Sequence, residues 1–135
     1  SQDLEEIKES IEEQEAVKLI STRDWDPKDL VLAADLTTTS NSTLAFEAIY
    51  MHRPVISLQP NLRTTDYLAI LTKNRLIPAG YDKTVCTELI QTAIMNKVFR
   101  EELVQRSSSF RTDGKATQRV TNLIYETLGI SPKNQ

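Results

Sequence analysis

The sequence has little of what several kinds of functional site require. It contains one cysteine, Cys86, and one histidine, His52, among 135 residues. One cysteine cannot form an internal disulfide, and a zinc site built from cysteine and histidine needs more of both residue types. A nucleophilic cysteine needs a base beside it, so the preferred interpretation of Cys86 is a small buried hydrophobe. We expect no metal and no cofactor.

An excess of positive charge is also absent. The formal net charge is −3 and the sequence pI is about 5.2. A nucleic-acid-binding domain usually carries a basic surface, so nucleic acid is not an expected partner. No apolar run approaches the ~18 residues of a membrane helix, and the polar, acidic start does not resemble a signal peptide. We therefore expect no membrane span and a cytoplasmic location.

What the sequence does contain is typical of one folded domain, residues 1–135, with 39% hydrophobic residues. Residue pattern predicts helices at 1–15, 27–34, 43–51, 66–75, 84–96, 97–106 and 114–128, and strands at 16–21, 35–39, 55–58 and 76–80. Strands that alternate with helices favour parallel pairing with helices on the faces. The expected fold class is α/β: a three-layer Rossmann-like domain with a mainly parallel sheet of about four strands and helices on both faces.

The polar segment 38–43 is the first candidate site. It lies between a predicted strand and a predicted helix, and parallel α/β sheets bind ligands at the carboxyl ends of their strands. Helix N-termini favour anions, so a phosphate is a suitable ligand there. The alternative is that Ser42 or Thr43 only caps the helix. The candidate hydrogen-bonding residues are Thr39, Ser40, Asn41, Ser42 and Thr43.

Glu47 lies one turn inside the same predicted helix. Its carboxylate could accept hydrogen bonds from a sugar diol at the strand-end crevice. The alternative is a surface glutamate that is stabilised by the helix dipole. Residue type and position leave both interpretations open.

The run AADLTTTSNSTLAFEAIYMHRPVISLQP resembles the C-terminal half of GT-B-fold glycosyltransferases and of the related non-hydrolysing nucleotide-sugar epimerases. The shared pattern is an "aD" strand, a Ser/Gly-rich turn, a helix that carries a glutamate, and then a small residue, a lysine and a proline before an apolar strand. The closing run DGKATQRVTNLI is similar to the family's last helix. The resemblance covers about residues 17–81.

The resemblance implies a nucleotide-sugar ligand, which we take to be a UDP-type donor. Ser40, Asn41, Ser42 and Thr43 would contact the phosphates or the sugar, and Glu47 would bind the ribose. Residues after the next strand would touch the donor sugar, and Arg63 would balance diphosphate charge. These second-rank candidates are Gln59, Asn61, Arg63 and Thr64.

The chain departs from the family pattern in two places. The turn 38–43 has no glycine, and His52 stands where the family has a glycine that ends the helix with positive φ. His52 must then adopt that conformation or end the helix in another way, and we do not expect it to be a catalytic base.

The family's transfer reaction needs a second, acceptor-binding half, so the resemblance implies a fragment of a larger protein that acts with a missing N-terminal half or another chain. This chain alone offers no nucleophile–base pair. Two alternatives remain: a non-catalytic α/β interaction module, which could form a homodimer through an exposed sheet edge, and an epimerase.

Overall fold

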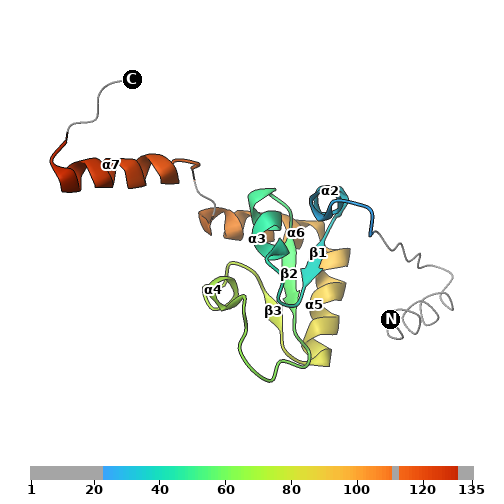
Figure 1. Ribbon diagram of the computed structural model, residues 1–135. Coiled ribbons are helices and arrows are strands. Elements are labelled where there is room, and N and C mark those ends of the chain that lie inside the picture. Colours follow the sequence, from blue (N-terminus) through green and yellow to red (C-terminus); the bar gives the residue numbers. More distant parts are fainter. Residues whose placement is uncertain (1–22, 111–112, 131–135) are drawn as a thin grey trace.

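The computed structural model describes residues 23–110 and 113–130 (Figure 1). Helices and strands alternate through the first part of this region, as the sequence predicts. The predicted helix at 1–15 and the predicted strand at 16–21 lie outside the described residues. The helices are α2 (Pro27–Ala33), α3 (Leu44–Tyr50), α4 (Ala69–Thr72), α5 (Lys83–Met95), α6 (Lys97–Ser107) and α7 (Ala116–Leu128); the strands are β1 (Thr37–Thr39), β2 (Val55–Leu58) and β3 (Ala79–Gly80); a 3₁₀ turn, η1, spans Ser108–Phe110.

The strands form one parallel sheet in the order β1-β2-β3. Thr37 pairs with Val55, and Ser57 pairs with Ala79. Each connection between neighbouring strands includes a helix, because parallel strands cannot be joined by a tight hairpin. The mixed α/β class with a parallel sheet is therefore confirmed, with three strands in the described region.

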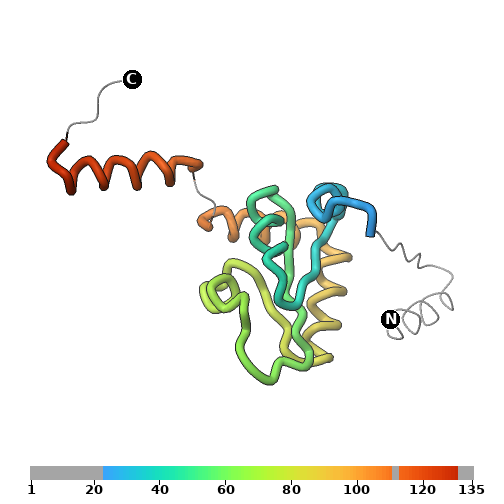
Figure 2. Tube along the Cα trace, in the orientation of Figure 1, coloured from blue at the N-terminus to red at the C-terminus, as the bar shows by residue number. Residues whose placement is uncertain are grey.

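Two apolar clusters flank the central strand. Val55 belongs to a cluster that includes residues of α2, α3 and α4. Ile56 belongs to another cluster, with residues of α5 and α6. Successive side chains of a strand point to opposite faces, so these clusters lie on opposite sides of β2. Figure 2 shows α4 and α5 on opposite sides of the strands. This double burial explains why the 55–58 run is almost continuously apolar.

Local capping residues set several helix boundaries where the sequence predicts them. The carboxylate of Asp26 accepts a hydrogen bond of 2.9 Å from the Lys28 backbone N–H at the start of α2. Asp82 and Asn96 cap α5 and α6 in the same way. Helix α7 ends at Gly129, whose φ of 65° is in the left-handed region, as predicted.

Helix α3 ends at Tyr50, and His52 lies two positions beyond its last residue. His52 adopts a φ of 58°. The Arg53 N–H donates to the Ala48 carbonyl at 2.9 Å, and the His52 N–H donates to the Ile49 carbonyl at 3.1 Å. These two bonds satisfy carbonyls of the last turn, so a histidine takes the role that glycine usually has there.

Two helices differ from the sequence-based expectation. The predicted helix at 66–75 is regular only over α4, because Asp66 uses its carboxylate for tertiary contacts and Arg75 adopts a φ of 56°. Helix α7 has its predicted bounds within two residues, but none of its residues is buried, and it lies apart from the sheet in Figure 1. Its apolar residues Leu123 and Ile124 are 62% and 52% exposed.

Candidate functional site

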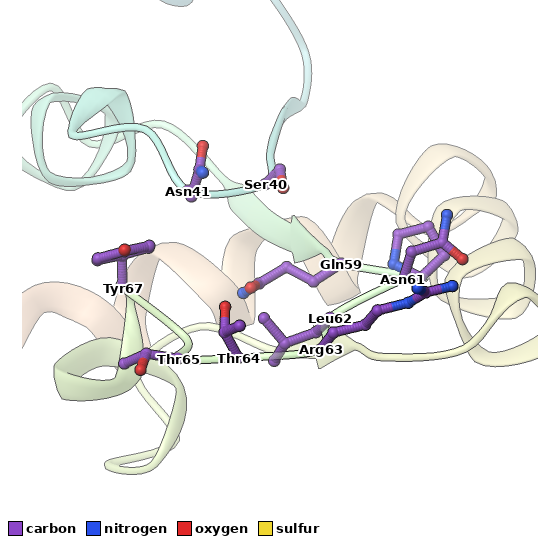
Figure 3. A pocket seen from close by; sticks show the side chains of 10 residues that line it. Ser40, Asn41, Gln59, Asn61, Leu62, Arg63, Thr64, Thr65 and Tyr67 are labelled. Carbon is purple, nitrogen blue, oxygen red and sulfur yellow. The ribbon is translucent and has the colours of Figure 1, made fainter.

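A cavity of about 380 Å³ lies at the carboxyl ends of β1 and β2. Two chain segments line it: the turn after β1 and the loop that follows β2 (Figure 3). The strands are parallel neighbours, so their ends open at the same edge of the sheet. The volume is within the usual range for a small-molecule site. The lining residues are Ser40, Asn41, Gln59, Pro60, Asn61, Leu62, Arg63, Thr64, Thr65 and Tyr67.

The turn after β1 is held by its own hydroxyl groups. The Thr39 hydroxyl, which is buried, accepts from the Ser42 N–H at 3.1 Å. The Ser42 hydroxyl accepts from the Leu44 N–H at 3.2 Å, whereas Thr43 makes no side-chain capping bond. Ser42 therefore satisfies one backbone N–H at the start of α3, while the N-cap position itself belongs to Thr43. Ser40 and Asn41 are exposed, and their side chains form the part of this turn that lines the cavity.

The structure brings six of the ten sequence-predicted residues to the cavity and leaves four outside its lining. Glu47 is half-buried in α3 and is not a lining residue. Thr39 and Ser42 hold the turn through their hydroxyl groups, and Thr43 is the N-cap residue of α3. The six residues at the cavity are Ser40, Asn41, Gln59, Asn61, Arg63 and Thr64.

Gln59 connects the sheet to the loop. It is 4% exposed and follows β2 directly. Its Nε2 donates to the Ser57 hydroxyl and to Oδ1 of Asp66, both at 2.8 Å. The side chain therefore lies between the end of β2 and the far end of the loop, and it forms part of the cavity wall (Figure 3).

Asp66 is the centre of the polar network behind the loop. Besides Gln59, its carboxylate accepts from the Leu68 N–H at 2.8 Å, and from the hydroxyls of Thr72 and Tyr81, each at 2.7 Å. These contacts join the loop to α4 and to the residue after β3. The sequence prediction missed this role. An aspartate just before an apolar run signals a helix cap, but a partner 15 positions away, such as Tyr81, leaves no local pattern.

The network sets the protonation of both its acidic groups. Burial raises the pKa of Asp66, but the hydrogen bonds from Gln59, Thr72, Tyr81 and Leu68 outweigh it and lower the pKa from 3.8 to about 2. Burial, together with the hydrogen bond to Asp66 and its negative charge, raises the pKa of the Tyr81 phenol. At neutral pH Asp66 is therefore an ionised acceptor, and Tyr81 is a neutral donor.

Arg63 is the only charged residue among those that line the cavity. It is exposed, as are Asn61 and Thr64. Tyr67, also a lining residue, is 72% exposed and adds an aromatic ring to the lining of the cavity. The combination of one cation, several neutral hydrogen-bonding groups and one ring suits a ligand that has anionic, hydroxyl and flat parts.

The two residues with other reactive groups lie away from this cavity. Cys86 is buried, as predicted, and its Sγ would lie 2.8 Å from a Cβ added at Gly80. His52 precedes β2 and borders a different cavity, of about 330 Å³, with Arg53 and Pro54. Among the described residues no cluster of three His, Cys, Asp or Glu side chains could hold a metal ion. In the same part of the chain, no helix has the length and apolarity needed to cross a bilayer.

The residues that line the cavity offer one cation and several hydrogen-bonding groups, and they do not include a nucleophile with an adjacent base. Six candidates that are separated by up to 24 positions in the sequence meet around one cavity. Comparisons with models of known protein families, with curated proteins and with solved structures gave no match.

Proposed function

We propose that this chain is the nucleotide-sugar donor-binding domain of a GT-B-type glycosyltransferase. The supporting observation is the cavity between the turn after β1 and the loop after β2, because the resemblance places the donor site between these two segments. In this proposal the sheet is the centre of a three-layer Rossmann-like domain of about four strands in the cytoplasm. Sugar transfer requires an N-terminal half that binds the acceptor.

The side chains that line the cavity are chemically suited to a UDP-type donor. Arg63 can neutralise part of the diphosphate charge, and the amides of Asn41 and Asn61 can bond phosphate or sugar oxygens. The Tyr67 ring provides a face on which a base or a sugar can stack. The cavity, at about 380 Å³, holds part of such a ligand and leaves the rest open to a second domain.

Calorimetric titration with a panel of nucleotide sugars tests the proposal. We expect a UDP sugar to bind, and we expect Arg63→Gln and Asn41→Ala each to weaken binding by about fivefold to tenfold, since each removes one charged or polar contact. Arg75→Gln is the matched control, because Arg75 is exposed and does not line the cavity. Absence of binding to every nucleotide sugar, with the fold intact by circular dichroism, would contradict the proposal.

A non-catalytic interaction module is the second candidate function, and α7 favours it. Val120, Leu123, Ile124 and Leu128 are all more than half exposed, and an exposed apolar helix face is typical of a surface that binds a partner. Such a module would form a homodimer or a complex with another chain. Light scattering at high protein concentration distinguishes the two functions. A chain that stays monomeric and binds a nucleotide sugar supports the donor-binding function and not the interaction module.

A further inference from the structure

The carboxamide of Gln59 has its two donor hydrogens committed inside the protein. Nε2 donates to the Ser57 hydroxyl and to the Asp66 carboxylate, each at 2.8 Å. A carboxylate that is ionised at neutral pH can only accept, so the nitrogen and not the oxygen must face Asp66. The geometry therefore fixes which way the amide points, an assignment that is often ambiguous for a glutamine.

The oxygen of this amide differs from the nitrogen in its hydrogen bonding. Oε1 of Gln59 accepts no hydrogen bond from any described residue, although the residue is 96% buried, as its exposed fraction of 4% implies. The described residues also contain no fully buried side-chain oxygen or nitrogen without a partner. Oε1 must then reach open space, and the open space beside Gln59 is the cavity (Figure 3). A largely desolvated acceptor there requires a donor from solvent or from a ligand.

We infer that Gln59 is a specificity-determining residue: its Oε1 accepts a hydrogen bond from an O–H or N–H group of the ligand, and Asp66 is the positioning residue that keeps the amide in this orientation. This inference rests on the proposed nucleotide-sugar function. It adds that Gln59 accepts a hydrogen bond from one particular hydroxyl or imide N–H of the ligand. A ligand that offers only an acceptor at that point is rejected, because two acceptors would then face each other.

Asp66 acts from behind the cavity wall. It does not line the cavity, and its carboxylate reaches Gln59 through Oδ1. Three further donors hold that carboxylate in place: the Leu68 N–H, the Thr72 hydroxyl and the Tyr81 hydroxyl. Loss of the carboxylate would free the Gln59 amide to rotate, and either its oxygen or its nitrogen could then face the ligand.

The test compares UDP-glucose with analogues that each lack one donor: deoxy and fluoro sugars, and the 3-methyluridine form, whose imide N–H is replaced. For the full chain we expect one analogue to bind at least about tenfold more weakly than UDP-glucose. Gln59→Met keeps the length of the side chain without its amide. In this variant the binding of UDP-glucose should weaken, and the difference in affinity between UDP-glucose and that analogue should disappear. A Gln59→Met variant that retained the wild-type discrimination would overturn the inference.

Variants at Asp66 separate positioning from mere loss of structure. Asp66→Ala should lose the discrimination, whereas Asp66→Asn should restore most of it, because the asparagine oxygen can accept from Gln59 and from Leu68 as Oδ1 does. Thr72→Val is the matched control: it removes one donor to Asp66 without touching Gln59, so the discrimination should remain. Equal weakening of all ligands in Asp66→Ala and Asp66→Asn would overturn the positioning role.

A direct readout on the wild-type chain does not depend on any variant folding. In ¹⁵N NMR spectra the Gln59 side-chain N–H protons should exchange slowly with solvent, and the side-chain carbonyl carbon should shift when UDP-glucose binds. Binding without that shift, and without discrimination among the analogues, would overturn the inference and leave the donor-binding function intact. Failure of every nucleotide sugar to bind would instead contradict the proposed function and the inference together.

Discussion

The Asp66 network makes the stability of the domain depend on pH in a defined direction. The folded-state pKa of Asp66 is about 2, below its ordinary value of 3.8. A carboxylate with a depressed folded-state pKa stabilises the fold at every pH above the unfolded-state value. This stabilisation is lost as the pH falls from about 4 through about 2, because the folded state then takes up the proton that the unfolded state already holds.

The size of this effect follows from the difference between the two pKa values. One pKa unit corresponds to about 1.4 kcal/mol, so the lowering from 3.8 to about 2 corresponds to about 2.5 kcal/mol at most. Asp66 is only half-buried and solvent screens part of its interactions, so we expect about 1–2 kcal/mol. Asp66→Asn has no proton to gain and should lack this pH-dependent contribution.

Urea unfolding followed by circular dichroism measures the prediction. At about pH 6 the wild-type chain should be more stable than Asp66→Asn by about 1–2 kcal/mol, and the gap should close towards about pH 2. Thr72→Val keeps the carboxylate but removes a donor, so its pH-dependent loss should be smaller and should be complete at a higher pH than in the wild-type chain. A difference in free energy of unfolding between the wild-type chain and Asp66→Asn that stays constant from about pH 6 to about pH 2 would refute the reasoning.

Two further predictions concern backbone positions that do not line the cavity. Gly80→Ala should lower the free energy of unfolding by about 1–3 kcal/mol, because the added Cβ would lie 3.0 Å from the Cα and N atoms of Cys86, which no side-chain rotation can move; a urea midpoint equal to that of the wild type would contradict this. Arg75→Gly should raise the free energy of unfolding by about 1 kcal/mol, because Arg75 holds a φ of 56° that glycine adopts without strain. Lys73→Gly, at a helical φ of −67°, is its control and should lower the free energy of unfolding by about 1 kcal/mol, and equal effects of the two substitutions on thermal midpoint would contradict the argument.

The parts of the fold that local chemistry decides could be predicted from the sequence. Asp26 with Pro27 marks the start of α2, Gly129 marks the end of α7, and the apolar run of β2 indicates a strand buried on both faces. The position of Ser40 and Asn41 at a ligand-sized cavity could also be predicted, since a turn that follows a parallel strand lies at the binding edge.

The remaining features depend on contacts between distant residues. The sequence predicts only a helix at Asp66, because its hydrogen bonds to Gln59, Thr72 and Tyr81 have no sequence signature. Helix α4 is also shorter than its predicted span. The apolar side of α7 has the spacing of a buried face, yet periodicity states only that a face is apolar and not what covers it.

The central claim, that the cavity between Ser40 and Tyr67 binds a nucleotide sugar, is tested most directly by NMR chemical-shift mapping with UDP-glucose. The backbone resonances of Ser40, Asn41 and the loop 59–65 should shift in a saturable way, and so should the side-chain amides of Asn41 and Gln59. Residues of the other cavity, such as Arg53 and Arg100, should not shift. Shifts confined to that second cavity, or no shift in a folded chain, would contradict the account.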